Sequence, residues 1–413
     1  MVDYKKYTLS NGLRLIVHQD TSTPMVAVNV VYDVGSRDEL PDRTGFAHLF
    51  EHLMFAGSAN VADFDVPIQT AGGENNAFTN CDMTSFYNIV PARNIETVLW
   101  LESDRMQSLV ISEESLAVQK KVVVEEFKET CLNEPYGDMM HHLLEQAYKK
   151  HPYRWPTIGL VPEHISEACL EDVTSFYHRY YNPANAIIVV AGNIAEDQSY
   201  KLVQKWFADI PAGPRPTRSI ASEGRQARPR TKTVAASVPL PVLYRGYHMV
   251  DRLHPDYYTY DLLSDALGNG RSSRLYQRLH KDQKLFSVID SYISGSFDPG
   301  LFILEGQPMP SVDMDTARRA ITEQLDLLKE ELLPDAELQK IKNKVESSLE
   351  YAEMNVLHKA QSLAYFELLG DANMINMEGA SYQKITSEDI RRVAQEVFTE
   401  DNCCEVVYQP VEG

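Results

Sequence analysis

The chain has 413 residues, of which 44% are hydrophobic and 24% are charged, a composition typical of a globular protein with two or more domains. Its formal net charge of −20 argues against nucleic acid as a partner, because binding to phosphates depends on basic residues. Five scattered cysteines without a C-x-x-C pair are too few for a disulfide framework and indicate a reducing compartment.

The beginning of the sequence, MVDYKKYTLSNGLRLIV, has no long apolar stretch of the kind found in signal peptides. No apolar run elsewhere approaches the length of a membrane span. We therefore expect a cytoplasmic protein that does not bind membranes. A periplasmic or organellar protein is expected instead if a targeting segment was removed from this sequence.

The first half of the chain alternates between strand and helix patterns. An Asn11-Gly12 turn separates two short strand patterns, and residues 25–34 are apolar and rich in β-branched side chains. Helical patterns follow, one of which begins after Ser112, a residue that favours helix starts. Residues 170–194 then have the pattern of a helix, an Asn-Pro turn and a buried strand. This mixture predicts an α+β fold.

A pattern that carries chemistry lies in residues 44–58, TGFAHLFEHLMFAGS. If this stretch is helical, His48 and His52 stand one turn apart on one face, so that both imidazoles reach one metal ion. Glu51 borders the same face without having to be a ligand, which suits a general base. The order H-x-x-E-H is the inverted form of a zinc peptidase motif. These residues predict a zinc site in which Glu51 takes the proton of an attacking water.

The spacing alone is only suggestive in a chain with twelve histidines, and a zinc site needs a third ligand. The helical pattern after Ser112 is the nearby one that is dense in glutamates. Surface glutamates are usually solvated, so the residues alone do not single one out, although the apolar residues 122–124 favour the later group. The candidates are Glu113, Glu114, Glu125, Glu126 and Glu129.

Residues 211–230, PAGPRPTRSIASEGRQARPR, lack a hydrophobic period and are rich in Pro, Gly, Ser and Arg. We expect a linker here, and its five arginines favour a solvated or interdomain tether over a binding motif. The linker separates a domain of residues 1–210 from a domain of residues 231–413.

The second domain echoes the first. Residues 387–410 repeat the helix, Asn-containing turn and apolar strand of residues 170–193, which indicates a duplication of a unit of roughly 200 residues. Residues 257–279 occupy the place of the H-x-x-E-H helix but contain no comparable set of metal ligands. The sequence therefore predicts two similar α+β domains, of which only the first carries a metal site.

Four features together resemble the pitrilysin/insulysin family of zinc peptidases, in the short two-domain subfamily that includes the mitochondrial processing peptidases. They are HLFEH, the following GGENNAFTN, the acidic VVVEEFKE and the duplicated half. The resemblance covers essentially the whole chain. It implies two similar domains, each a mainly antiparallel sheet packed with helices, which enclose a chamber.

The resemblance also implies the metal ligands. One Zn²⁺ per chain would be held by His48, His52 and a glutamate of the acidic stretch. Counting forward without gaps from the N-A-F-T motif places that glutamate at Glu126, with Glu129 as the alternative. Gln119 occupies a position, seven residues earlier, at which the family usually has another glutamate.

Peptide binding is a further implication of the resemblance. The N-A-[FY]-T strand of the family is an exposed edge that pairs with an extended peptide backbone. Asn76, Ala77 and Phe78 would therefore supply main-chain hydrogen bonds to the substrate. Because the backbone carries this recognition, we expect a loose sequence preference.

The chain departs from the family in the second domain. Active single-chain members carry an Arg and a Tyr, seven residues apart, which hold the substrate near the scissile bond. His280 and Ser287 stand at those two places here, and Arg278 does not replace the pair because Leu285 lies seven residues after it. We therefore expect a partner chain, either a homologous non-zinc subunit that supplies the missing pair in a heterodimer or another dimer partner.

The leading hypothesis is a zinc metalloendopeptidase that hydrolyses unfolded peptides or oligopeptides. The alternative is a non-catalytic or weakly active subunit that binds peptide or acts as a scaffold in a larger complex. The intact H-x-x-E-H motif argues against this alternative. A zinc hydrolase acting on a non-peptide is disfavoured by the N-A-F-T motif.

Overall fold

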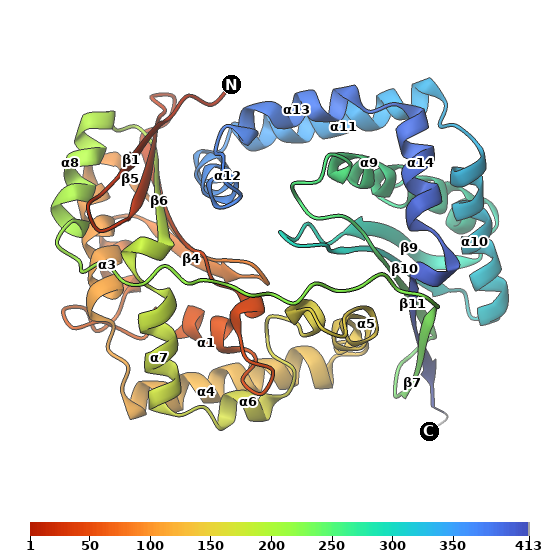
Figure 1. The fold of residues 1–413 in the computed structure, drawn as a ribbon, viewed down its shortest axis with the longest axis horizontal. Coiled ribbons are helices and arrows are strands. Elements are labelled where there is room, and N and C mark those ends of the chain that lie inside the picture. Colours follow the sequence, from red (N-terminus) through yellow and green to blue (C-terminus); the bar gives the residue numbers. More distant parts are fainter. Residues whose placement is uncertain (412–413) are drawn as a thin grey trace. The chain divides into compact units, whose positions relative to one another are not determined.

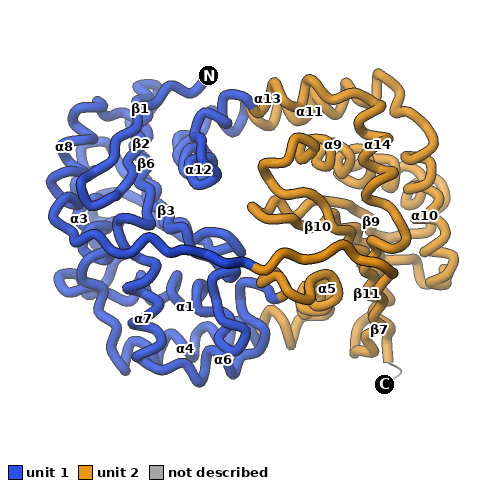
Figure 2. The backbone as a smooth tube through the Cα atoms, viewed as in Figure 1, with its two compact units in different colours: residues 1–128, 155–220, 350–377 blue, residues 129–154, 221–349, 378–413 orange. Residues whose placement is uncertain are grey.

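The computed structural model describes residues 1–411 (Figure 1). The chain divides into two compact units, which are coloured separately in Figure 2. Unit 1 comprises residues 1–128, 155–220 and 350–377, and unit 2 comprises residues 129–154, 221–349 and the residues from 378 onwards. Each unit combines one sheet with several helices, which confirms the predicted α+β class.

Unit 1 contains a six-stranded sheet with the order β1-β2-β6-β3-β5-β4. β2 and β6 run parallel and all other neighbours run antiparallel, so β1 and β4 form the two edges. Gly12, with a φ of 87°, lies in the predicted turn between β1 and β2. The strands are β1 (Lys5–Thr8), β2 (Arg14–Gln19), β3 (Met25–Tyr32), β4 (Glu74–Thr79), β5 (Thr84–Pro91) and β6 (Ala186–Gly192).

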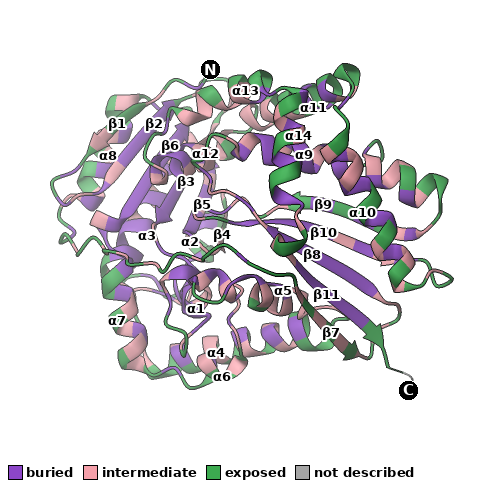
Figure 3. Cartoon of the chain, turned by 45° about the vertical axis from the view of Figure 1, so that its right-hand side comes forward, coloured by how far each residue is buried: buried purple, intermediate pink, exposed green. Residues whose placement is uncertain are grey.

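Helices cover both faces of this sheet, which explains why β3 is apolar on both sides. Val26, Val28 and Val30 contribute to the main core of unit 1, whereas Ala27 and Val31 pack in a second cluster with residues of α12. Figure 3 shows the central strands as largely buried. The helices of unit 1 are α1 (Phe46–Leu53), α2 (Asp65–Thr70), α3 (Ile95–Ser108), α4 (Glu113–Phe127), α6 (Pro162–Ser166), α7 (Leu170–Tyr180), α8 (Glu196–Phe207) and α12 (Val356–Leu368), with short 3₁₀ turns η1 (Ser36–Asp38), η2 (Ala92–Asn94) and η5 (Pro183–Asn185).

Unit 2 contains a five-stranded sheet with the order β7-β11-β8-β10-β9. Its core lies between this sheet and helices that include α9, α10 and α14. The strands are β7 (Arg230–Ala236), β8 (Val242–His248), β9 (Phe286–Ile293), β10 (Leu301–Pro308) and β11 (Cys403–Pro410). The helices are α5 (Met139–Ala147), α9 (Tyr257–Leu267), α10 (Met314–Glu330) and α14 (Ser387–Val397), with π-helical turns η3 (Lys128–Asn133) and η6 (Tyr276–Asp282) and 3₁₀ turns η4 (Pro152–Arg154) and η7 (Glu400–Asn402).

The two sheets have the same topology, apart from the additional edge strand β1. In each, one parallel pair, β2–β6 or β7–β11, continues into antiparallel strands that end at β4 or β9. The helix–turn–strand segments that repeat in the sequence form α7 with β6 and α14 with β11. The structure therefore has the duplicated architecture that the sequence predicted.

The units are interleaved along the chain, whereas the sequence predicted two consecutive domains of residues 1–210 and 231–413. Residues 129–154 belong to unit 2 and residues 350–377 belong to unit 1. α11 (Asp335–Glu353), α13 (Met374–Lys384) and the π-helical turn η3 each contain a boundary between the units. Sequence repetition does not reveal such exchanges, because it reports common descent rather than which segments pack together.

The expected linker contains no helix or strand in residues 211–229. Most of these residues are exposed, and the segment contacts both units at individual side chains. Nε of Arg218 donates to Oδ1 of Asp38 at 2.6 Å within unit 1, and the buried Gln226 donates to the carbonyl of Cys403 at 2.9 Å within unit 2.

Within residues 1–411, no helix combines the length and the apolar character that crossing a membrane would require.

Candidate metal centre

The H-x-x-E-H motif lies on α1, as predicted. Gly45 precedes this helix with a φ of 88°, a conformation that favours glycine. The motif residues His48, Glu51 and His52 are half-buried. The opposite side of α1 is anchored in the core of unit 1 by Phe46, Leu49, Phe50 and Leu53.

The start of α1 is held by Glu39, a residue that the sequence did not single out. Its buried carboxylate accepts hydrogen bonds from the N–H groups of Gly45 and Ala47, both at 2.9 Å. These N–H groups would otherwise lack partners at the end of a helix. Burial raises the pKa of Glu39 well above its ordinary value, and the two N–H groups oppose that shift.

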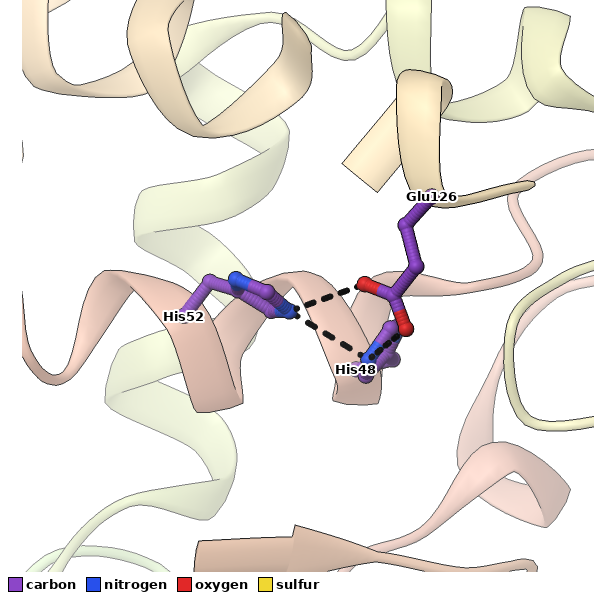
Figure 4. Close-up of side chains that lie close together, drawn as sticks. All are labelled: His48, His52 and Glu126. Atoms are coloured by element: carbon purple, nitrogen blue, oxygen red, sulfur yellow. Dashed lines mark hydrogen bonds and ion pairs between the residues drawn. The ribbon is translucent and has the colours of Figure 1, made fainter. Parts of the chain in front are cut away.

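The structure brings three potential metal ligands together (Figure 4). The Nε2 atoms of His48 and His52 lie 3.3 Å apart. From α4, Glu126 approaches both rings, with Oε1 3.6 Å from Nε2 of His48 and Oε2 3.4 Å from Nε2 of His52. Within residues 1–411, this is the one group of three His, Cys, Asp or Glu side chains with ligand atoms close enough to share an ion.

The separations fit a zinc ion. Zinc binds imidazole nitrogen and carboxylate oxygen at about 2.0–2.2 Å in tetrahedral geometry, which places neighbouring ligand atoms roughly 3.4 Å apart. The observed separations of 3.3, 3.4 and 3.6 Å are close to that value, although the two from Glu126 involve different oxygens. With one ligand atom from each residue, all three atoms lie within 4.8 Å of one another. Two imidazoles and one carboxylate would leave a fourth position for water or substrate, as in hydrolytic zinc sites.

The electrostatics of the three side chains also suit a cation. Burial lowers the pKa of His48, an effect that His52 supports and that Glu126 and Glu51 oppose. The hydrogen bond from His52 lowers the pKa of Glu126, while burial opposes it. Neutral imidazole and ionised carboxylate are the forms that bind metals. The second ring nitrogen of His48, Nδ1, is buried without a hydrogen-bond partner in the described chain.

Glu51 stands beside this group and is not part of it. Its Oε2 accepts a hydrogen bond of 2.7 Å from the hydroxyl of Thr79, the last residue of β4. The carboxylate therefore contacts the strand that was expected to bind the peptide. Thr79 was not among the predicted site residues, although it is the final residue of the N-A-F-T motif and this position was its only signal in the sequence.

The other acidic candidates on this stretch point elsewhere. Glu125 is exposed and pairs with Lys128 at 2.6 Å. Glu129 is exposed in η3, outside the helix that carries Glu126. Gln119 lies on α4 seven residues before Glu126 and is half-buried. The geometry thus favours Glu126 over the alternative that the sequence left open.

Asn76, Ala77 and Phe78 lie on β4, which is an edge of the sheet and pairs only with β5 within the described residues. The side-chain Oδ1 of Asn76 accepts the N–H of Ala77 at 2.8 Å. Asn76 is exposed, and Ala77 and Phe78 are half-buried. The strand is therefore available at one edge for pairing with an added strand.

His280 and Ser287 lie in unit 2, where both contact their own chain. Nδ1 of His280, in η6, lies 3.0 Å from the carbonyl of Phe286, and its ring stacks on Tyr276. The hydroxyl of Ser287, on β9, donates to the carbonyl of Gln307 at 3.0 Å. Each residue thus has a local role in its fold.

Comparisons with known proteins agree with this arrangement. A family model described as Insulinase (Peptidase family M16) matches residues 14–159, and one described as Peptidase M16 inactive domain matches residues 169–345. The first match contains α1, β4 and α4. The second covers most of the half in which no metal ligands were predicted.

Similar proteins share the full length of the chain. The zinc protease PqqE of Helicobacter pylori is 29% identical over 424 residues, which cover 98% of this chain and 93% of that protein. An uncharacterized zinc protease of Bacillus subtilis, YmxG, is 27% identical and covers 96% of both chains. A solved structure of a protease from Helicobacter pylori superposes with a TM-score of 0.94 at 28% identity, over 99% of this chain and 100% of that one. The chain belongs to the insulinase family of peptidases, family M16.

Proposed function

We propose that this chain is a zinc metallopeptidase that hydrolyses unfolded peptides or oligopeptides held as an added strand on β4. The observation that carries the proposal is the convergence of His48, His52 and Glu126 beside a carboxylate, Glu51, that contacts β4. Its relatives in Helicobacter pylori and Bacillus subtilis are named zinc proteases, which supports zinc as the metal.

His48, His52 and Glu126 would hold one Zn²⁺ per chain. Zinc bound at such a site would lower the pKa of a bound water molecule and polarise the carbonyl group of the scissile peptide bond. Glu51 accepts the proton of the attacking water and passes it to the leaving nitrogen. Oε2 of Glu51 accepts the hydroxyl of Thr79, and Oε1 has no such bond in the described chain and is available to take this proton.

The substrate would lie along the free edge of β4. Backbone groups of Asn76, Ala77 and Phe78 pair with the peptide, so an unfolded and extended substrate is required while its side chains matter less. The N–H of Ala77 currently donates to its neighbour Asn76, and pairing with a peptide would replace that bond. This mode of binding favours peptides over folded proteins.

A second chain is part of the proposal. His280 and Ser287 stand where the family resemblance implies an Arg and a Tyr that hold the substrate, and each is engaged with a backbone carbonyl of its own chain. A second copy of this chain would carry the same two residues. We therefore propose that the chain is the zinc subunit of a heterodimer whose other subunit is a homologue that lacks the metal motif and supplies the Arg and Tyr.

Metal analysis combined with an internally quenched peptide assay tests the proposed activity. The purified protein, alone and with candidate homologues, should contain one zinc per chain and cleave the peptide. Chelation should abolish cleavage, and added zinc should restore it. Zinc-loaded protein that binds peptide without cleaving it, with every homologue tested, would instead favour a peptide-binding or scaffold subunit.

A further inference from the structure

Thr79 joins the strand that would bind the peptide to the carboxylate that would act as the base. The residue ends β4, and its hydroxyl donates to Oε2 of Glu51 at 2.7 Å. Both residues are half-buried and both belong to unit 1. In the described chain, no other hydrogen bond to the carboxylate of Glu51 is present.

The position of Thr79 is itself fixed by the turn that follows it. Oδ1 of Asn80 accepts the N–H groups of Asp82 and Met83 at 2.8 and 2.9 Å, which closes the turn between β4 and β5. Arg37 pairs with Asp82 at 2.9 Å and holds the turn against the segment that precedes α1.

The same segment meets the turn through its backbone. The N–H of Ser36 donates to the carbonyl of Asn80 at 3.1 Å, and that of Arg37 donates to the carbonyl of Cys81 at 3.0 Å. Gly35 allows this close approach, because a Cβ at this position would lie 2.5 Å from backbone atoms of the turn. Thr79 is therefore attached to a well-anchored end of β4.

We propose that Thr79 is a positioning residue that holds Glu51 in the orientation for proton transfer and couples it to occupancy of β4. A glutamate side chain has three rotatable bonds, and one fixed oxygen restricts them while leaving the other oxygen free for the proton. A peptide that pairs with the free edge of β4 orders the same short strand that ends at Thr79. Peptide docking and alignment of the base thus become one event. This inference rests on the proposed function.

Two substitutions at one position separate the hydroxyl from the packing of the side chain. Thr79→Val keeps the shape of the side chain and removes the donor, whereas Thr79→Ser keeps the donor. We expect Thr79→Val to lower kcat by about 10- to 100-fold with KM changed by less than about threefold, because a misplaced catalytic group is costly. Thr79→Ser should restore kcat to within about threefold of the natural chain.

Thr84 provides the matched control. It lies directly opposite Thr79 in the β4–β5 pair, but its hydroxyl donates to the carbonyl of Val34 and not to Glu51. Thr84→Val therefore disturbs the same hairpin without touching the base. Its kcat should stay within about twofold of the natural value, even where its melting temperature falls.

Two further measurements do not depend on the rate of the natural enzyme. Zinc content should be the same in Thr79→Val, Thr79→Ser and the natural chain, because in the described chain the hydroxyl of Thr79 bonds to Glu51 and not to His48, His52 or Glu126. In crystals of the metal-free protein, Thr79→Val should show Glu51 in more than one orientation and Thr79→Ser should show one.

A background of Glu51→Asp tests whether Thr79 acts through Glu51. The shorter carboxylate does not reach the hydroxyl, so adding Thr79→Val to Glu51→Asp should reduce kcat by no more than about twofold further. A full 10- to 100-fold additional loss would overturn the inference, as would equal kcat in Thr79→Val and Thr84→Val. If the natural chain cleaves no peptide under any condition, the proposed function itself fails. If the natural chain cleaves peptide and the Thr79→Val variant is equally active, only the role of Thr79 is rejected.

Discussion

Glu126 on α4 places its Oε2 3.4 Å from Nε2 of His52 on α1, so that two helices far apart in sequence share one site. Replacing Glu126 by Gln removes the negative charge of the third ligand. We expect zinc content to fall sharply, as measured by elemental analysis after dialysis against a weak chelator.

The neighbouring glutamates give the matched controls for this experiment. Glu125 pairs with Lys128, and Glu129 is exposed in η3, so Glu125→Gln and Glu129→Gln should retain zinc. A protein that loses zinc on Glu129→Gln but keeps it on Glu126→Gln would show that the third ligand has been misassigned.

Glu39 should matter for the stability of the metal helix. Glu39→Leu leaves the N–H groups of Gly45 and Ala47 without their acceptors in a buried place. Each such loss costs about 1–3 kcal/mol, so we expect the free energy of unfolding to fall by at least about 2 kcal/mol. Chemical denaturation of the metal-free protein measures this without a contribution from zinc.

Glu114, an exposed acidic residue in the first turn of α4, serves as the control for Glu39. Glu114→Leu should change the free energy of unfolding by no more than about 0.5 kcal/mol. Equal effects of the two substitutions would mean that the bonds from Glu39 to the start of α1 contribute little.

Recognition through β4 predicts a dependence on the peptide backbone. In an extended peptide, every second N–H group faces β4 and the N–H groups between them face away from it. N-methylation at the positions that face β4 removes the N–H groups that pair with the strand. One set of N-methyl peptides should therefore raise KM by about tenfold or more, and the other should have little effect. A uniform response to N-methylation along the peptide would argue against strand addition.

The partner prediction concerns the Arg and Tyr that this chain lacks. We expect the isolated chain to be roughly a hundredfold slower than a complex with a homologue that supplies them, because they would stabilise charge in the transition state. Mixing the purified subunits and measuring cleavage tests this, and substitution of that Arg in the partner should return the rate to that of the isolated chain. Full activity of the isolated chain, unaffected by any homologue, would contradict it.

The part of the site that the sequence predicted follows from the geometry of a single helix. His48, Glu51 and His52 are close in sequence, so the period of the helix alone determines their relation. Glu126 depends on how α4 packs beside α1, and several glutamates on that stretch have the same residue type. The residues left this choice open, and only the comparison with a known family selected one of them.

Other features depended on contacts that no local pattern records. Glu39 precedes α1 by several residues, and only the folded chain brings its carboxylate back to the N–H of Ala47. Residues 211–230 contain no local pattern that identifies a contact, yet Asp38 binds Arg218 within this segment. α12 lies more than 150 residues after β6 in the sequence but packs on the same sheet. In each case the fold brings together residues whose pairing depends on the tertiary path of the chain.

Glu51→Gln tests the assignment of the general base, because this substitution keeps the shape of the side chain and removes only its ability to accept a proton. Zinc content and cleavage of a quenched peptide should be measured on the same preparations of the natural chain and the variant, each alone and with candidate homologues. We expect one zinc per chain in both proteins and a loss of turnover of at least about a hundredfold in the variant. Cleavage by Glu51→Gln at the natural rate, with zinc bound, would contradict the assignment of Glu51 as the base.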